Sequence, residues 1–161
     1  MTDMLAKLYN LPPLQPELDR QHAQNIEIRR ALAPEKHLVL AWVGATFSAY
    51  WVSECEIAFT RQPITCYIAI HAQRVIGFAC YDVTKRGFFG PTGVDESARG
   101  QGTGKALLLT CLHDMWAQGY GYAIIGGVGP IDFYEAVVGA TVIPDSTPGV
   151  YRGLLRQSPE E

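Results

Sequence analysis

A glycine-rich junction between an apolar strand and an amphipathic helix constrains the fold of this chain more than any other sequence feature. The segment Val94–Leu108 reads VDESARGQGTGKALL and carries glycines at positions 100, 102 and 104. Beyond it, apolar residues at 107, 108, 111, 112, 115 and 116 have the spacing of one helix face. The first turn of a helix carries unpaired N–H groups and the positive end of the helix dipole. The junction therefore predicts an anion site at the start of a helix over residues 102–118.

Two common phosphate loops do not fit this spacing. The nucleotide-triphosphate loop would need glycine where Arg99 stands and a hydroxyl where Ala106 stands. The dinucleotide pattern started from Gly100 finds Lys105 in place of its last glycine. What remains is the pattern R-x-x-G-x-G over residues 99–104, whose structural alternative is a helix cap that binds no ligand.

The rest of the chain predicts short strands and helices around this junction. Alternating and apolar runs predict strands at 25–31, 65–70, 75–83, 87–94, 122–128, 141–143 and 150–155. Helices are predicted at 34–59, broken near Gly44–Ser48 with Ser48 as an N-cap, and at 102–118 and 131–138. The two early helices are strongly apolar and are expected to be well buried. The resulting order, βααβββαβαββ, predicts an α+β fold with helices on both faces of the sheet.

The two ends of the chain are expected to be loosely attached. Prolines at 12, 13 and 16 disfavour regular helix and inner strand, so residues 1–25 are predicted to form an arm that wraps the domain or a partner. Residues 26–155 form the domain, and residues 156–161 a polar tail.

Composition narrows the class of protein. The 161 residues include 13 Lys and Arg against 16 Asp and Glu, a net charge of −3 that disfavours nucleic acid as a partner. The longest uncharged apolar stretch, Leu38–Val52, is shorter than the roughly 18 residues of a membrane-spanning helix. No signal peptide is apparent at the start, so we expect a cytoplasmic protein that does not use a membrane.

The four cysteines predict no metal site. Cys55, Cys66, Cys80 and Cys111 match no paired metal-ligand spacing, and we interpret them as reduced thiols. None lies beside a histidine in a recognisable nucleophile motif, although Cys80 stays open as a minor alternative for a covalent route.

On the loop Arg99–Gly104, the helix after it and the later motif FYEAVVGA (Phe133–Ala140), the chain resembles the GCN5-related N-acetyltransferase (GNAT) family over about residues 26–155. The acetyl-CoA pyrophosphate loop of that family reads [QR]-x-x-G-x-[GA]. The resemblance implies a mixed, mostly antiparallel central sheet. It also implies acetyl-CoA as co-substrate, with no metal.

The resemblance implies specific contacts with acetyl-CoA. The backbone of Val94 would pair with the pantetheine arm, and the amides around Gly100–Gly104 would hold the pyrophosphate. The strands 87–94 and 122–128 would splay apart, and Gly126–Gly127 is the local hint of that opening. The residues expected to bind acetyl-CoA are Val94, Arg99, Gly100, Gln101, Gly102, Thr103, Gly104, Lys105 and Phe133.

The resemblance also implies an acid, and the chemistry requires a base. Tyr134 matches the family's tyrosine near the CoA sulfur, and a phenol is protonated at neutral pH. The attacking amine must lose a proton, yet the strand GFFGPTGV carries no carboxylate. Glu54, Glu56 and Asp82 stay open as candidate bases, each with a surface charge as its structural alternative. The chain departs from the family at Gly127 and Pro130, where asparagine and alanine are frequent.

The function predicted from these features is transfer of an acetyl group from acetyl-CoA to a primary amine by direct attack in a ternary complex. A small amine or an amino sugar is favoured as acceptor, with Trp42, Tyr50, Trp51 and Phe59 as candidate pocket residues or as core. The alternative is an acyl-CoA-binding sensor without catalysis. A homodimer is compatible with the arm and the late strands.

Overall fold

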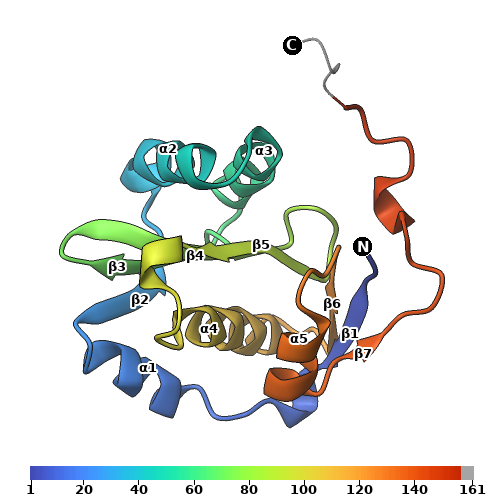
Figure 1. Ribbon diagram of the computed structural model, residues 1–161, viewed down its shortest axis with the longest axis horizontal. Coiled ribbons are helices and arrows are strands. Elements are labelled where there is room, and N and C mark those ends of the chain that lie inside the picture. The colour runs from blue at the N-terminus through green and yellow to red at the C-terminus, as the bar shows by residue number, and fades with distance from the viewer. Residues whose placement is uncertain (157–161) are drawn as a thin grey trace.

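The computed structural model describes residues 1–156 and folds them around one seven-stranded sheet (Figure 1). The strands are β1 (Met4–Lys7), β2 (Ile26–Arg30), β3 (Cys66–His71), β4 (Arg74–Tyr81), β5 (Phe88–Val94), β6 (Tyr122–Ile125) and β7 (Thr141–Val142). The helices are α1 (Gln15–His22), α2 (Lys36–Thr46), α3 (Ala49–Ala58), α4 (Thr103–Ala117) and α5 (Ile131–Val138). Short 3-10 turns occupy Leu8–Asn10, Ala33–Glu35, Glu96–Ala98 and Gly149–Tyr151.

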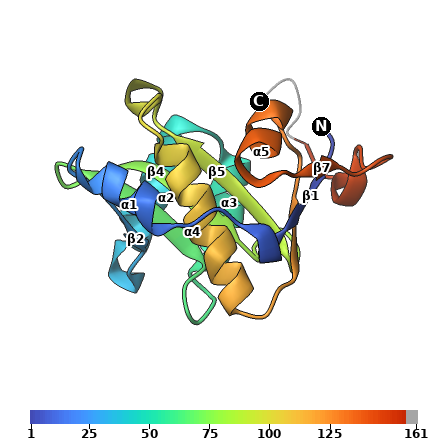
Figure 2. The same ribbon diagram turned by 90° about the horizontal axis from the view of Figure 1, so that it is seen from below.

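The sheet is mixed and mostly antiparallel, as predicted. Its order is β2-β3-β4-β5-β6-β1-β7, and only the β5–β6 pair is parallel. Helices α2 and α3 lie on one face, and α1 and α4 on the other (Figures 1 and 2). No helix within residues 1–156 is long and apolar enough to cross a membrane.

The period-two pattern of the strands divides the core into two clusters. Phe78 and Cys80 of β4 face α2 and α3, whereas their neighbours Ala79 and Tyr81 join the cluster under α4. Alternate side chains of a strand point to opposite faces, so one apolar run serves both layers. This arrangement explains why the strands look continuously apolar in sequence.

Local signals placed most of the elements correctly. Ser48 caps α3, its hydroxyl accepting a hydrogen bond from the Trp51 N–H at 3.3 Å. Ala72 and Gln73, with φ of 49° and 62°, form the two-residue turn of the β3–β4 hairpin. Gly139 ends α5 with φ of 64°. The expected burial of the two early helices was wrong in extent, because Leu38 is 59% and Ile57 39% exposed.

The N-terminal segment is not a loose arm. Residues Met4–Lys7 form β1 inside the sheet, between β6 and β7, and Met4 pairs with both Ile125 and Val142. The prolines expected to prevent this lie after the strand, and Pro16 stands in the first turn of α1, where its missing N–H costs nothing. The segment between them crosses α4 (Figure 2), with His113 Nε2 2.7 Å from the Pro12 carbonyl oxygen.

The last predicted strand, residues 150–155, is absent from the sheet. The edge of β6 that faces away from β5 is already paired with β1. Residues Gly149–Tyr151 instead form a 3-10 turn, and Gly149 and Gly153 adopt positive φ. Strand β6 also ends three residues earlier than predicted, at Ile125. The polar tail predicted at 156–161 lies, after Arg156, outside the described residues.

Candidate active site

The loop between β5 and α4 leaves a row of backbone amides without helical partners. Gly100 and Gly102 have φ of 81° and 79°, a conformation that favours glycine. The Ala106 N–H donates to the Gly102 carbonyl at 3.0 Å, so the N–H groups before it have no partner inside the helix. A Cβ added at Gly100 would meet no atom within 4 Å. The loop therefore faces open space with the positive end of α4, as an anion site requires.

Eight of the nine residues expected to bind acetyl-CoA belong to one stretch of the chain, residues 94–105, from the end of β5 to the first turn of α4. Arg99 is exposed and its Nε donates to the Val94 carbonyl at 3.3 Å. Lys105 in the first turn of α4 pairs with Glu17 at 3.2 Å. Phe133 stands apart from the loop on α5, where its ring meets the Tyr134 ring at 5.0 Å.

Strands β5 and β6 part after a short contact. They pair only at Phe88–Ile124 and Phe89–Ile125, whereas β5 continues to Val94 beside β4 alone. The Asp95 N–H donates to the Ile76 carbonyl. Because backbone groups alternate in direction along an antiparallel strand, the N–H and C=O of Val94 point away from β4, toward the side that β6 has left.

A cavity of about 870 Å³ opens at this divergence. Its wall includes residues of α3, β5, the β6 end, α5 and the C-terminal segment. Apolar side chains and glycines dominate the wall; among residues 1–156, Glu54 is the only carboxylate residue that lines it, beside the cationic Lys85 and Arg156. The polar and aromatic side chains of the wall include Tyr50, Trp51, Glu54, Thr84, Tyr134 and Tyr151.

Tyr134 is buried and lines this cavity. It is 5% exposed, and its ring contacts those of Phe89 and Phe133 edge-on. Burial raises the pKa of Tyr134 to about 12. Within the described residues its hydroxyl makes no hydrogen bond, so it is free to meet a group inside the cavity. The residue is therefore a neutral proton donor at every pH at which the protein would be assayed.

Glu54 of α3 lines the cavity, and one of its carboxylate oxygens accepts hydrogen bonds from two hydroxyl groups. The Thr84 hydroxyl donates a hydrogen bond to Glu54 Oε2, and the Tyr151 hydroxyl donates to the same oxygen at 3.4 Å. Both donors therefore lie beside the carboxylate on the wall of the cavity. Glu56, by contrast, forms an exposed ion pair with Lys36 and does not line the cavity.

Asp82, like Glu56, does not line the cavity with Glu54. Its Oδ1 accepts from the Gly87 N–H at 2.7 Å and its Oδ2 accepts from the Tyr120 hydroxyl at 2.6 Å. With φ of 57°, Asp82 holds the turn between β4 and β5, and it lies outside the wall of the main cavity. Its two oxygens thus link the turn to the segment between α4 and β6.

The candidate pocket aromatics divide between cavity and core. Tyr50 and Trp51 line the cavity, whereas Trp42 and Phe59 pack against the core cluster beneath α2 and α3. The rings of Trp42, Phe47, Trp51 and Phe78 contact one another with centroids 4.8 to 5.9 Å apart. Trp51 thus joins the core to the cavity wall.

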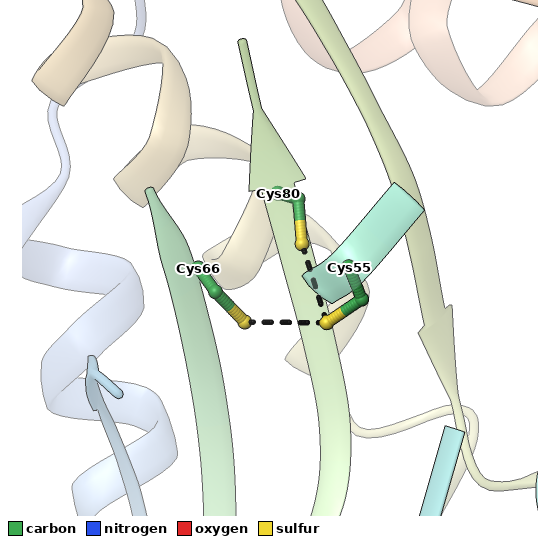
Figure 3. Close-up of side chains that lie close together, drawn as sticks. All are labelled: Cys55, Cys66 and Cys80. Atoms are coloured by element: carbon green, nitrogen blue, oxygen red, sulfur yellow. Dashed lines mark hydrogen bonds between the residues drawn. The ribbon is translucent and has the colours of Figure 1, made fainter. Parts of the chain in front are cut away.

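Three cysteines distant in sequence meet in the core. The Sγ atom of Cys55 lies 4.0 Å from that of Cys66 and 3.8 Å from that of Cys80 (Figure 3). All three are fully buried among apolar side chains such as Phe78. Burial raises the pKa of the Cys80 thiol, and no lysine or arginine acts on it. Cys80 does not line the cavity, and the three thiols pack among apolar side chains, so we attribute the cluster to packing.

Sequence reasoning missed two residues that organise the site. Asp3 is 7% exposed, and its Oδ1 accepts from the Gly127 N–H at 2.9 Å, which fixes the chain just after β6. Gln21 of α1 forms hydrogen bonds with Gln101 and Thr103 of the glycine loop. Both lie in the segment expected to be an arm, and neither carries a local motif that could have revealed it.

Comparison with known proteins agrees with this architecture. The model of the acetyltransferase (GNAT) family matches residues 7–140. The chain therefore belongs to the GNAT acetyltransferase family. No curated protein matches it.

Solved structures share the fold at low sequence identity. The glucosamine N-acetyltransferase region of a fungal multi-domain GH3 β-N-acetylglucosaminidase superposes with a TM-score of 0.72 at 16% identity, over 88% of this chain and 19% of that one. A GNAT from Sphaerobacter thermophilus gives 0.61 at 17%, over 88% and 48% of the two chains. One from Kribbella flavida gives 0.56 at 13%, over 88% and 53%. The chain thus spans about half of these two bacterial proteins and a fifth of the fungal one.

Proposed function

We propose that this protein transfers an acetyl group from acetyl-CoA to the nitrogen of a primary amine in a ternary complex. The observation that carries the proposal is the continuity of two features. The cavity lined by Tyr134 and Glu54 lies where β5 and β6 part, and β5 runs on from the wall of that cavity to Val94 and the open amides of Gly100–Lys105. A candidate diphosphate site and a candidate reaction chamber are therefore joined by one strand and the turn that follows it.

The residues present suit acetyl-CoA. The loop amides and the exposed Arg99 would hold the diphosphate, Lys105 would add a positive charge beside it while its ammonium group pairs with Glu17, and the Val94 N–H would hold the pantetheine arm. The glycines keep the cradle open, since a side chain at Gly100 would project into that space. The bound thioester would supply the activated acetyl group.

Glu54 and Tyr134 have complementary roles in this proposal. As the amine nitrogen bonds to the acetyl carbon and the carbon–sulfur bond breaks, one proton must leave the nitrogen and one must reach the sulfur. Glu54, whose carboxylate is oriented by two hydroxyl donors, accepts the proton from the amine, directly or through water. Tyr134, kept neutral by burial, donates to the sulfur.

The acceptor proposed is a small amine with an apolar or sugar body. Glu54 supplies a single negative charge for an ammonium group, and Tyr50, Trp51 and Tyr151 offer flat surfaces for the rest of the molecule. The structural neighbour described as a glucosamine N-acetyltransferase region makes amino sugars the first acceptors to test.

The direct test combines binding with turnover. Calorimetry with CoA should show stoichiometric binding, and thiol release from acetyl-CoA should depend on one class of amine in a panel of amino sugars, polyamines and amino acids. Absence of CoA binding would refute the proposal. Intact-protein mass spectrometry with acetyl-CoA alone should show no stoichiometric acetylation of cysteine, because such a species would replace direct transfer by a covalent route.

A CoA-binding sensor without catalysis is the second candidate. It is favoured by the lack of a carboxylate on β5 and by the hydroxyls that occupy Glu54. Tight CoA binding with no turnover across the panel, unchanged by Tyr134→Phe, would establish it.

A further inference from the structure

Gln21 of α1 is a polar side chain in an unusual place. It is 1% exposed and is among the largest fully buried side chains of the described chain, alongside Phe78 and Leu107. Burying an amide costs free energy unless both of its ends are hydrogen-bonded. The partners of Gln21 therefore indicate what the residue is for.

Both ends of the Gln21 amide bind the glycine loop. Its Nε2 donates to the Gln101 carbonyl at 2.8 Å, and its Oε1 accepts from the Thr103 hydroxyl at 2.7 Å. Gly102 lies between these two contacts, and a Cβ there would stand 3.4 Å from Gln21 Nε2. One side chain thus spans the loop at the residue where α4 begins.

The rest of α1 reinforces this contact. The Gln24 amide, just after the helix, donates to the same Gln101 carbonyl at 3.2 Å. Glu17, 7% exposed, pairs with Lys105 in the first turn of α4. Side chains of α1 and of the residues just after it therefore contact both the loop and the first turn of α4.

We infer that Gln21 is a positioning residue for anion binding by the loop, an inference that rests on the proposed function. Glycines leave a free loop with many conformations, and ordering them on binding would weaken affinity. Gln21 fixes Gln101 and Thr103 beforehand, so the amides between them stay aimed at the diphosphate. The residue acts through the loop and touches no reacting atom.

The test compares three variants on the full chain. Gln21→Ala removes both hydrogen bonds. Gln21→Glu keeps the shape but, when ionised, sets a carboxylate oxygen against the Gln101 carbonyl. Gln15→Ala is the matched control, because Gln15 lies on the same helix and its side chain bonds only the exposed Asp19. Calorimetry gives the Kd of CoA, kinetics give kcat and the KM of acetyl-CoA, and amide exchange of Thr103 and Gly104 is followed without ligand.

For Gln21→Ala we expect a Kd and KM raised about tenfold, the size of one or two lost hydrogen bonds, with kcat changed less than about twofold. Exchange of the loop amides should quicken. Gln21→Glu should regain affinity relative to the parent protein as pH falls, because a protonated carboxyl can again donate to Gln101 and accept from Thr103. Gln15→Ala should match the parent protein.

Other outcomes separate the two proposals. If the parent protein binds CoA but Gln21→Ala and Gln21→Glu bind it equally well at all pH values, Gln21 is only structural and the inference fails alone. A fall in kcat or in folded fraction at constant KM would overturn the inference in the same way. If the parent protein itself shows no affinity for CoA, the proposed function fails first. Should Gln21→Ala not fold, the pH response of Gln21→Glu decides.

Discussion

At the scale of single residues, the cavity assigns opposite tasks to two ionisable groups. Tyr134 is buried with its hydroxyl unpaired within the described chain, whereas Glu54 receives two hydroxyl donors. Desolvation favours the neutral phenol of Tyr134. In the proposed function Tyr134 is the acid and Glu54 the base.

Replacing Tyr134 by phenylalanine tests the acid. The change removes one oxygen and keeps the ring contacts with Phe89 and Phe133, so we expect kcat to fall roughly a hundredfold with little change in the KM of acetyl-CoA. The pKa of about 12 means that Tyr134 stays protonated up to strongly alkaline pH, so the parent protein should show no loss of rate from this group below about pH 11. Tyr9→Phe, an exposed site, is the control. Equal rates for both variants would remove Tyr134 from the mechanism.

Glu54→Gln tests the base. The amide keeps the size of the side chain but cannot accept a proton, so we expect kcat to drop on the order of a hundredfold at neutral pH. Higher pH should restore part of the rate, since the acceptor amine then arrives already neutral. Glu56→Gln on the same helix should behave like the parent protein, because Glu56 pairs with Lys36 away from the cavity. If both glutamine variants lose activity alike, the cavity is not the reaction site.

Residues contiguous in sequence were predictable, and residues assembled by the fold were not. The loop Arg99–Lys105 could be recognised because its chemistry depends on backbone conformation within a few positions. Glu54 meets Tyr151 across 97 positions, and Gln21 meets Thr103 across 82, so no local pattern encodes either contact. The hydrogen-bond partners of Asp82, Gly87 and Tyr120, likewise come together only in the folded chain.

At the scale of elements, β1 is the addition that local signals did not reveal. Four residues, Met4–Lys7, bridge β6 and β7 and complete the sheet beyond the cavity. A strand this short has little pattern of its own, and its place is decided by the unpaired edge that β6 offers. The hairpin, the capped helix α3 and the helix α5, by contrast, carry their own turn and cap residues.

Met4→Ala should reveal how much β1 contributes to stability. The Met4 side chain is fully buried in the core cluster under α4, so truncation should lower the free energy of unfolding by about 2–5 kcal/mol. Met1→Ala is the matched control, because Met1 is 76% exposed and should change stability by less than about 0.5 kcal/mol. Urea unfolding measures both. A small effect at Met4 would mean that β1 is only loosely held.

At the scale of the whole molecule, the net charge is −3, and some of the charged side chains form ion pairs. Arg29 holds both oxygens of Glu35, at 2.8 and 2.6 Å, where the chain leaves β2 for α2. Hydrogen bonds from Arg29 lower the pKa of Glu35 to about 2. Because this folded-state pKa is below the unfolded value of 4.5, the contribution to stability is complete above pH 4.5 and disappears as pH falls toward 2.

In the Glu35→Gln variant the free energy of unfolding should therefore depend less on pH below about pH 4.5. At pH 7 we expect the variant to be less stable by about 1 kcal/mol, with the difference from the parent protein shrinking between about pH 4.5 and pH 2. Glu27→Gln is the control, since Glu27 is an exposed carboxylate 3.7 Å from the same arginine. Thermal unfolding across this pH range gives the comparison. A difference that stays constant with pH would show that Glu35 is not titrating as described.

The position of β1 has a consequence for how the protein is made. Residues 4–7 are synthesised before their strand neighbours. These neighbours, Tyr122–Ile125 and Thr141–Val142, leave the ribosome more than a hundred residues later. Strand pairings between residues so distant along the chain form slowly, because the entropy cost of closing a long loop comes before the free energy of the contacts is gained. Strands β2–β5 and helix α4 can assemble before β1 finds its partners. We therefore expect β1 to join the sheet late in folding, and the hydrogen bond between Asp3 and the Gly127 N–H at the cavity wall to form with it.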